Sequence, residues 1–324
     1  MTERFDSASK HETVASAATR VGKAKARFDA IRVDYPPQTA VVAALDEMRI
    51  SALGRPAHAP CGGAMLVAPH GCGKTESIVA LRRLLEASSD EGCKPLLHVE
   101  TAGAGTTDSL PTSILQALGA ARPDVGTEKA RWPRAIAEMQ RCGVQIVVFD
   151  EFNRAARRPR MSRAIATAIR EKVMDAGIAP VAFVGSEDAG SVLAQVPELM
   201  ERLDDDIDLS PLRWDTMGDR ALFVSFLADL DDAMVAAGIL ACLSDLTQQS
   251  IARPLWEASA GRVRRICKIV RSAMAFALHD GRAFINRDDL AEAVDSYCIP
   301  RDFCQNNPFA KQLGRRAPHF RHGG

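Results

Sequence analysis

The sequence predicts an α/β fold: a core with a parallel sheet flanked by helices, followed by a smaller all-helical domain. Within the core, apolar strand-like runs alternate with helical patterns, which is typical of βαβ units and so of parallel sheets. The run VQIVVFD at 144–150 is apolar almost throughout, as expected of a strand covered on both faces. After Trp214 the strand-like runs stop, and helical patterns dominate to about residue 296.

Local patterns place the individual elements in order. Short apolar runs predict four strands, at 64–69, 96–100, 144–150 and 180–185. Apolar residues at helical spacing predict the helices of the core, at 38–53, 73–87, 109–118, 129–140 and 161–176. An acidic strand is expected directly after Arg202. In the second domain, Asn286 followed by Asp289 signals the start of a helix.

These patterns divide the chain into four segments. They are a polar N-terminal arm expected to be flexible (1–27), the α/β core (28–210), a small helical domain (211–298) and a basic C-terminal tail (299–324).

Composition narrows the class of protein. The chain has 324 residues with 41 Lys+Arg and 41 Asp+Glu, so any contact with nucleic acid must come from local basic clusters. Its eight cysteines are scattered, and its N-terminus is charged where a secretory signal would be apolar. No apolar stretch approaches the length of a membrane span. We therefore expect a cytoplasmic protein with reduced thiols and no membrane partner.

A loop of small residues joins the first predicted strand to the helix after it. Residues 68–75, APHGCGKT, follow the pattern GxxxxGK[ST] with Ala68 in place of the first glycine. Such a loop points successive backbone N–H groups at phosphates, and the helix adds its positive N-terminal end. Lys74 can reach the β- and γ-phosphates, and the Thr75 hydroxyl can ligate Mg²⁺. The residues expected to bind the nucleotide are Pro69, His70, Gly71, Cys72, Gly73, Lys74, Thr75 and Glu76. The alternative is a chance loop.

Two adjacent carboxylates end the strand at 144–150. Asp150 would hold Mg²⁺, and Glu151 would act as the general base on an attacking water. The alternative is an acidic pair that only terminates a strand. A GTPase would carry an NKxD motif, which the sequence lacks, and a small-molecule kinase would not need the glutamate. The pair therefore favours ATP hydrolysis.

Two polar residues farther along the chain are candidates for contact with the γ-phosphate. Ser186 follows the fourth strand, although serine after glycine is also common turn chemistry. Arg202 precedes the acidic strand and, in an assembly, can reach a neighbour's γ-phosphate, an effect worth on the order of 10³-fold in rate or more. The alternative for Arg202 is a salt bridge to one of the acids that follow it, Asp204, Asp205 or Asp206.

A third candidate lies in the helical domain. Arg264 follows Gly261 by three residues, in the first turn of a predicted helix, and can contact the phosphates from above. Arg262 and Arg265 are competing candidates for the same role.

Together these parts resemble the AAA+ ATPases. More narrowly, from about residue 28 to 295 the chain resembles the TniB/TnsC family of transposition regulators, relatives of MuB and IstB. The segments that carry this likeness are IRVDYP (31–36), VVFDEFNR (147–154), PVAFVGSEDA (180–189), PELMERLDDDIDLSPLRW (197–214) and GRVRRICKIVRSAMAFALHDG (261–281).

The resemblance implies ATP and Mg²⁺ as ligands, assembly with itself into rings or helical filaments on duplex DNA, and marking of that DNA for a partner transposase. A targeting protein is a further candidate partner. By position, the family's roles fall on Lys74 and Thr75 (P-loop), Asp150 (magnesium), Glu151 (hydrolysis), Ser186 (sensor 1), Arg202 (arginine finger), Arg264 (sensor 2), and Tyr35 and Pro36 (adenine). The departures are Ala68 and the acids at 204–206.

Two loops are candidates for DNA contact. The segment FNRAARRPRMSR carries five arginines with no acid between them, which suits pairing with phosphates, although a solvated basic loop is an equal alternative. These arginines are Arg154, Arg157, Arg158, Arg160 and Arg163. The loop at 101–109 offers the small polar residues Thr101, Thr106 and Thr107. No motif for base recognition is present, so binding independent of sequence is expected.

Two other functions remain open. A helicase loader or replication initiator would normally carry a DNA-reading domain after the lid, and little chain follows residue 300. A scaffold that binds nucleotide with negligible turnover would not need Glu151.

Overall fold

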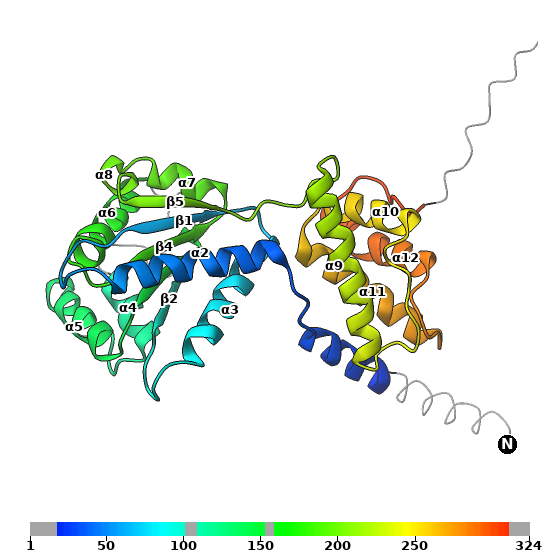
Figure 1. Cartoon of the computed structure of the whole chain (residues 1–324), viewed down its shortest axis with the longest axis horizontal. Helices are drawn as coiled ribbons and strands as arrows, with labels where there is room; N and C mark the ends of the chain where they lie inside the picture. Colours follow the sequence, from blue (N-terminus) through cyan, green and yellow to red (C-terminus); the bar gives the residue numbers. More distant parts are fainter. Residues whose placement is uncertain (1–17, 101–108, 153–158, 311–324) are drawn as a thin grey trace, which may run out of the picture. The chain divides into compact units, whose positions relative to one another are not determined.

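The computed structural model describes residues 18–100, 109–152 and 159–310. The chain divides into two compact units: an α/β unit, Tyr35–Pro211, and a helical unit made of Met1–Asp34 together with Leu212–Gly324. Figure 1 shows the sheet and its helices in the first unit and a bundle of helices in the second. The predicted fold class is confirmed.

The α/β unit is built on a five-stranded sheet in the order β2-β3-β4-β1-β5. Every neighbouring pair is parallel. The strands are β1 (Gly63–Val67), β2 (Leu96–Glu100), β3 (Ile146–Asp150), β4 (Val181–Gly185) and β5 (Leu203–Asp208). The five predicted strands are therefore confirmed, and their expected bounds differ from these by at most a few residues.

Helices cover both faces of this sheet. They are α2 (Pro36–Leu53), α3 (Lys74–Glu86), α4 (Leu110–Leu118), α5 (Glu128–Arg141), α6 (Pro159–Ile169), α7 (Glu187–Leu193) and α8 (Pro197–Met200). The helix predicted at 161–176 changes its pitch: α6 continues as a π-helix, η4 (Arg170–Met174).

Side-chain alternation along the strands explains the two layers. Leu66, Val148 and Val184 belong to a core that includes residues of α2 and α3, whereas Phe149 and Phe183 belong to a core that includes residues of α4, α5 and α6. Successive side chains of a strand point to opposite faces, so one apolar run fills both cores. This is why β3 is buried at every position.

Parallel strands give the sheet two chemically different edges. The register places Val67 beside Gly185 and Glu100 beside Asp150, so the loops that follow the strands meet at one edge, the carboxyl edge. Gly63 pairs with Leu203 at the opposite edge, the amino edge. Open α/β sheets bind their ligands in crevices outside the carboxyl ends of the strands.

The helical unit contains α9 (Met217–Ala236), α10 (Gln249–Ser259), α11 (Val263–His279), α12 (Arg287–Tyr297) and the short η5 (Ile299–Arg301). The start predicted for the last helix is confirmed: Asn286 accepts a hydrogen bond from the N–H of Asp289, and the Asp289 side chain accepts one from the N–H of Asn286.

The N-terminal part of the chain differs from the flexible arm expected for 1–27. Residues 18–30 form a helix whose Val21, Ala24 and Phe28 are buried in the helical unit. Arg20 donates to the carbonyl of Leu278 at 2.7 Å, and Arg27 donates to that of Gly238 at 3.2 Å. The two arginines thus stabilise the carboxyl ends of α11 and α9.

The start of the expected C-terminal tail also packs. Phe309 is buried, and Asn307 donates to the carbonyl of Ala291 at 2.8 Å. Residues 311–324 lie outside the described part of the chain. Within the described ranges, no helix combines the length and the apolar character needed to cross a bilayer.

Candidate active site

The loop between β1 and α3 has the backbone conformation of a phosphate cradle. Gly71 and Gly73 have positive φ angles of 88° and 106°, a region that glycine adopts readily. A Cβ at Gly73 would lie 2.0 Å from Nε2 of Gln38, so the position also needs glycine for space. The N–H of Ala68 donates to the carbonyl of Gly185 at 3.1 Å, which attaches the start of the loop to the end of β4.

Lys74 lies within this loop. Its side chain is buried, and its Nζ donates to the carbonyl of Ala68 and to that of Pro69, the latter at 3.1 Å. The lysine begins α3, whose early N–H groups have no intrahelical acceptor. A cation and several backbone donors therefore converge at one place, and this combination suits an anion.

Asp150 is held at the end of β3 by two donors. Its Oδ2 lies 3.2 Å from Nε2 of His98 on β2, and its Oδ1 accepts the N–H of Glu151 at 2.7 Å. Burial by itself raises the pKa of Asp150, but the bond from His98, the bond from Glu151 and the charges of His98 and Lys74 outweigh it, so the pKa lies below its ordinary value. Asp150 is therefore a carboxylate at neutral pH.

Glu151 adopts an unusual backbone conformation. Its φ is +56°, in the left-handed region that costs a residue with a side chain on the order of 1 kcal/mol. The turn redirects the chain directly after the buried strand, and the side chain is half-buried. Such local strain is common at functional sites.

The other residues expected at this site are distributed around the same edge. Ser186 is half-buried at the end of β4, which lies between the strand of Asp150 and the strand of the phosphate loop. Thr75 and Glu76 are exposed in the first turn of α3, and His70 is exposed in the loop, whereas Cys72 is buried. Ahead of α2, Tyr35 is buried and Pro36 is exposed.

These residues fit a nucleoside triphosphate with its magnesium ion. The glycine cradle and Lys74 suit phosphate oxygens. The Thr75 hydroxyl and the Asp150 carboxylate are hard oxygen ligands, which Mg²⁺ prefers. Glu151 follows Asp150 at the same edge, where a general base is needed.

Arg202 lies at the amino edge of the sheet. It directly precedes β5, and its carbonyl accepts the N–H of Gly63 at the start of β1. Its guanidinium is 3.2 Å from Oδ1 of Asp175, which follows η4. The sequence had suggested a salt bridge from Arg202 to Asp204, Asp205 or Asp206. In the described part of the chain, Arg202 pairs with Asp175 and not with Asp204 or Asp206. The side chain of Asp205 is not described.

The arginines of α11 have different surroundings within the helical unit. Arg265 stacks over the ring of Phe303, with its guanidinium carbon 3.8 Å from the ring centroid. Arg264 is exposed in the first turn of α11. Gly261, which precedes them, has a φ of 68°, and a Cβ there would lie 2.0 Å from the carbonyl oxygen of Leu212. The Arg265 guanidinium is thus stacked on an aromatic ring, whereas the Arg264 side chain is exposed to solvent.

Most residues predicted to contact DNA lie outside the description. These are Arg154, Arg157, Arg158, Thr101, Thr106 and Thr107. For Arg160 the structure gives the backbone, in α6, and no account of the side chain.

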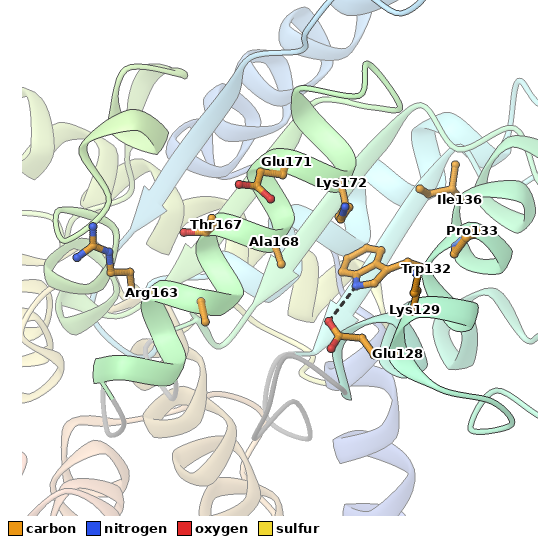
Figure 2. A pocket seen from close by; sticks show the side chains of 11 residues that line it. Glu128, Lys129, Trp132, Pro133, Ile136, Arg163, Thr167, Ala168, Glu171 and Lys172 are labelled. Atoms are coloured by element: carbon orange, nitrogen blue, oxygen red, sulfur yellow. Dashed lines mark hydrogen bonds between the residues drawn. The ribbon is translucent and has the colours of Figure 1, made fainter.

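Arg163 is exposed on α6 and borders a groove of about 860 Å³. Figure 2 shows Trp132 and Ile136 of α5 on one side of this groove and Thr167 and Ala168 of α6 on the other. The groove lies on the face of the sheet opposite α2 and α3, so it is separate from the phosphate loop.

Sequence reasoning missed two residues of the site. His98 is a polar side chain within the apolar strand LLHVE, and this interruption was the available signal. Gln38 lies in the first turn of α2, and its Nε2 is 3.3 Å from the carbonyl oxygen of Gly73. Nothing in its local sequence marks it, because the contact depends on how α2 packs on α3.

The sheet order, the phosphate loop and the strand-end carboxylates together define the fold of an AAA+ ATPase. The chain belongs to the TniB family: the sequence profile described as "Bacterial TniB protein" matches residues 29–211.

Solved structures share the fold at low sequence identity. The Aeropyrum pernix ORC1 protein, solved in complex with DNA, has a TM-score of 0.56 and 19% identity, with coverage of 80% of this chain and 65% of that one. Cdc6p from Pyrobaculum aerophilum has a TM-score of 0.54 and 17% identity, with coverage of 82% of this chain and 68% of that one. Drosophila ORC bound to DNA has a TM-score of 0.52 and 14% identity, with coverage of 85% of this chain and 65% of that one. This chain therefore spans less than two thirds of the length of ORC1. No curated protein sequence matches the chain.

Proposed function

We propose that this chain is an ATP-dependent DNA-binding regulator of transposition. It assembles on duplex DNA, marks the target site and recruits a partner transposase, and ATP hydrolysis controls its disassembly. The observation that carries this proposal is membership of the TniB family, supported by the placement of Lys74, Asp150 and Glu151 at one edge of the sheet.

Each side chain at the carboxyl edge has a role in the proposed hydrolysis. Lys74 exchanges its bonds to the loop carbonyls for bonds to the β- and γ-phosphates. Thr75 and Asp150 hold Mg²⁺, which supplies Lewis-acid stabilisation of the phosphate charge. Glu151 accepts the proton of the attacking water, and Ser186 positions that water or the γ-phosphate. His98 keeps Asp150 oriented and ionised.

Arg202 completes the site of a neighbouring subunit in this proposal. Five-residue strands at about 3.3 Å per residue put the amino edge roughly 17 Å from the carboxyl edge. This is farther than an arginine side chain reaches, so Arg202 cannot contact the nucleotide of its own subunit. Its action as a finger therefore requires a ring or a filament, with an effect on the order of 10³-fold in rate. The sensor 2 role is proposed for Arg264 from its position in the sequence alone, three residues after Gly261.

Contact with DNA is proposed to be independent of base sequence. The arginines between 154 and 163 pair with backbone phosphates, and the threonines of the loop at 101–109 add polar contacts. Neutralising three of the arginines should flatten the dependence of DNA affinity on salt concentration. An unchanged slope would remove this part of the proposal.

Electron microscopy of the purified protein with duplex DNA tests the proposal most directly. We expect rings or filaments around DNA in the presence of a non-hydrolysable ATP analogue and none without nucleotide. Monomers that respond to neither ligand would contradict the assembly on DNA and leave the nucleotide site as a separate question.

The likeness to ORC and Cdc6 structures favours a second candidate, a replication initiator or helicase loader. Such a protein would engage a helicase rather than a transposase. Transposition assays with candidate partner transposases separate the two, because an initiator would leave insertion frequency and target choice unchanged.

A further inference from the structure

The carboxylate that faces Arg202 comes from a distant part of the chain. Oδ1 of Asp175 is 3.2 Å from Nη2 of Arg202, and its Oδ2 is 3.5 Å from Nε of Arg170. The acids nearest to Arg202 in sequence, Glu201 among them, form no ion pair with it in the described part of the chain. The fold, and not the local sequence, therefore selects Asp175 as the partner.

The backbones of both residues are held against the segment that leads into β1. The N–H of Asp175 closes the last turn of η4 on the carbonyl of Arg170 at 2.8 Å, and the N–H of Cys61 donates to the carbonyl of Met174 at 2.9 Å. The N–H of Gly63 donates to the carbonyl of Arg202 at 2.9 Å. A carboxylate and a guanidinium on two rigid supports therefore meet at the amino edge.

The pair orients the guanidinium without enclosing it. The Arg202 side chain is 44% exposed, and that of Asp175 is 32% exposed. Oδ1 of Asp175 and Nε of Arg170 are buried atoms without a hydrogen bond of good geometry in the described structure. Such an ion pair contributes little to stability, but it restricts the rotamers of a long side chain. A guanidinium has five N–H donors, so most remain available to a second anion.

We propose that Asp175 is a positioning residue for the arginine finger. It holds Arg202 in the orientation from which the guanidinium meets the γ-phosphate bound by a neighbouring subunit, and Arg170 holds Asp175 in turn. This inference rests on the proposed function, because it requires Arg202 to act between subunits. It adds the residue that follows η4 to a site otherwise made of the P-loop, the strand ends and Arg202.

Mixed assemblies on duplex DNA test the inference. Acceptor subunits carry Arg202→Ala, so they keep a hydrolytic site and lack a finger. Donor subunits carry Glu151→Gln, so they supply a finger and do not hydrolyse. We expect neither species alone to turn over ATP, and an excess of donors to restore hydrolysis by the acceptors.

Asp175→Asn is then introduced into the donors only. The expected result is a kcat of the mixture lower by about 2- to 5-fold with an unchanged KM for ATP, because a partly exposed ion pair only biases the rotamers of the finger, and a loosened finger weakens the transition state and not nucleotide binding. Donors with Asp175→Glu should restore part of the rate. The matched control is Glu201→Gln, which removes an exposed acid next to Arg202 that forms no ion pair with it in the described part of the chain.

Each contrary outcome is distinct. If acceptors alone keep the wild-type rate, or donors restore nothing, Arg202 is not a finger acting between subunits, and the proposed function loses this part together with the inference. If restoration is normal but Asp175→Asn donors equal the control donors, the finger stands and the role of Asp175 is wrong. If Asp175→Asn donors fail to assemble on DNA, Asp175→Ser donors decide, because serine also lacks the carboxylate, and full restoration by them overturns the inference.

Discussion

The two edges of the sheet hold charged side chains in opposite kinds of surroundings. At the carboxyl edge, Lys74 and Asp150 are buried and their polar atoms have closely placed partners. At the amino edge, Arg202 and Asp175 are partly exposed and weakly paired. The difference suits the proposed division of work: a site that binds its own ligand is organised in advance, whereas a group that acts on a neighbour must remain accessible.

The largest effect should follow from a change in the cradle. Lys74→Ala should weaken ATP binding strongly and lower kcat/KM on the order of 10³-fold, because it removes the buried cation of the phosphate loop. Fluorescent-nucleotide titration and phosphate release measure this. Arg83→Ala, an exposed cation of the same helix, is the control and should leave both unchanged. Retained ATP affinity in Lys74→Ala would contradict the assignment of the loop.

A smaller loss should separate catalysis from binding at the same edge. Glu151→Gln should keep ATP affinity and lower kcat by about 10² to 10⁴, because the amide cannot accept the proton of water. Single-turnover hydrolysis with bound nucleotide measures the chemical step. Rates equal to wild type would favour a nucleotide-gated scaffold with negligible turnover.

The support of Asp150 should have a moderate effect that depends on magnesium. His98→Phe removes a partner that orients Asp150 and lowers its pKa. The Mg²⁺ concentration for half-maximal turnover should rise by about 10- to 100-fold, with little change at saturating Mg²⁺. A titration of turnover against Mg²⁺ checks this, and an equal loss at every concentration would point to misfolding instead.

The smallest effect is expected away from both edges, in the helical unit. A hydrogen bond from Arg271 holds the pKa of Asp29 below its ordinary value. The pair therefore stabilises the fold fully at pH values above 3.8, the pKa of Asp29 in the unfolded chain. This stabilisation is lost as the pH falls through the lower pKa that Asp29 has in the folded protein. Because Asp29 is largely exposed, Arg271→Gln should cost less than about 1 kcal/mol at pH 7 and less still at pH 3. Urea unfolding at both pH values measures this. Turnover should not change.

Much of the α/β unit was predictable because its central strands, β3 and β4, are apolar on both faces. Leu96–Glu100 was expected with its observed bounds, and β3 and β4 were expected to within two residues at each end. The pitch change at Arg170 was not predictable, since a π-helix keeps the same apolar pattern as the α-helix before it. The packed helix at 18–30 was missed because its short, alanine-rich sequence is stable only against α9 and α11.

By itself the sequence determined the fold class and the family, and it predicted the ATPase side chains. Those features are local, because a strand, a glycine cradle and an adjacent acid pair each occupy a few consecutive residues. Only the tertiary structure decided that His98 supports Asp150, that Gln38 lies against Gly73 and that Arg202 faces Asp175 instead of the acids beside it. These contacts join residues far apart in the chain, and their partners depend on strand order and helix packing, which no short sequence pattern specifies.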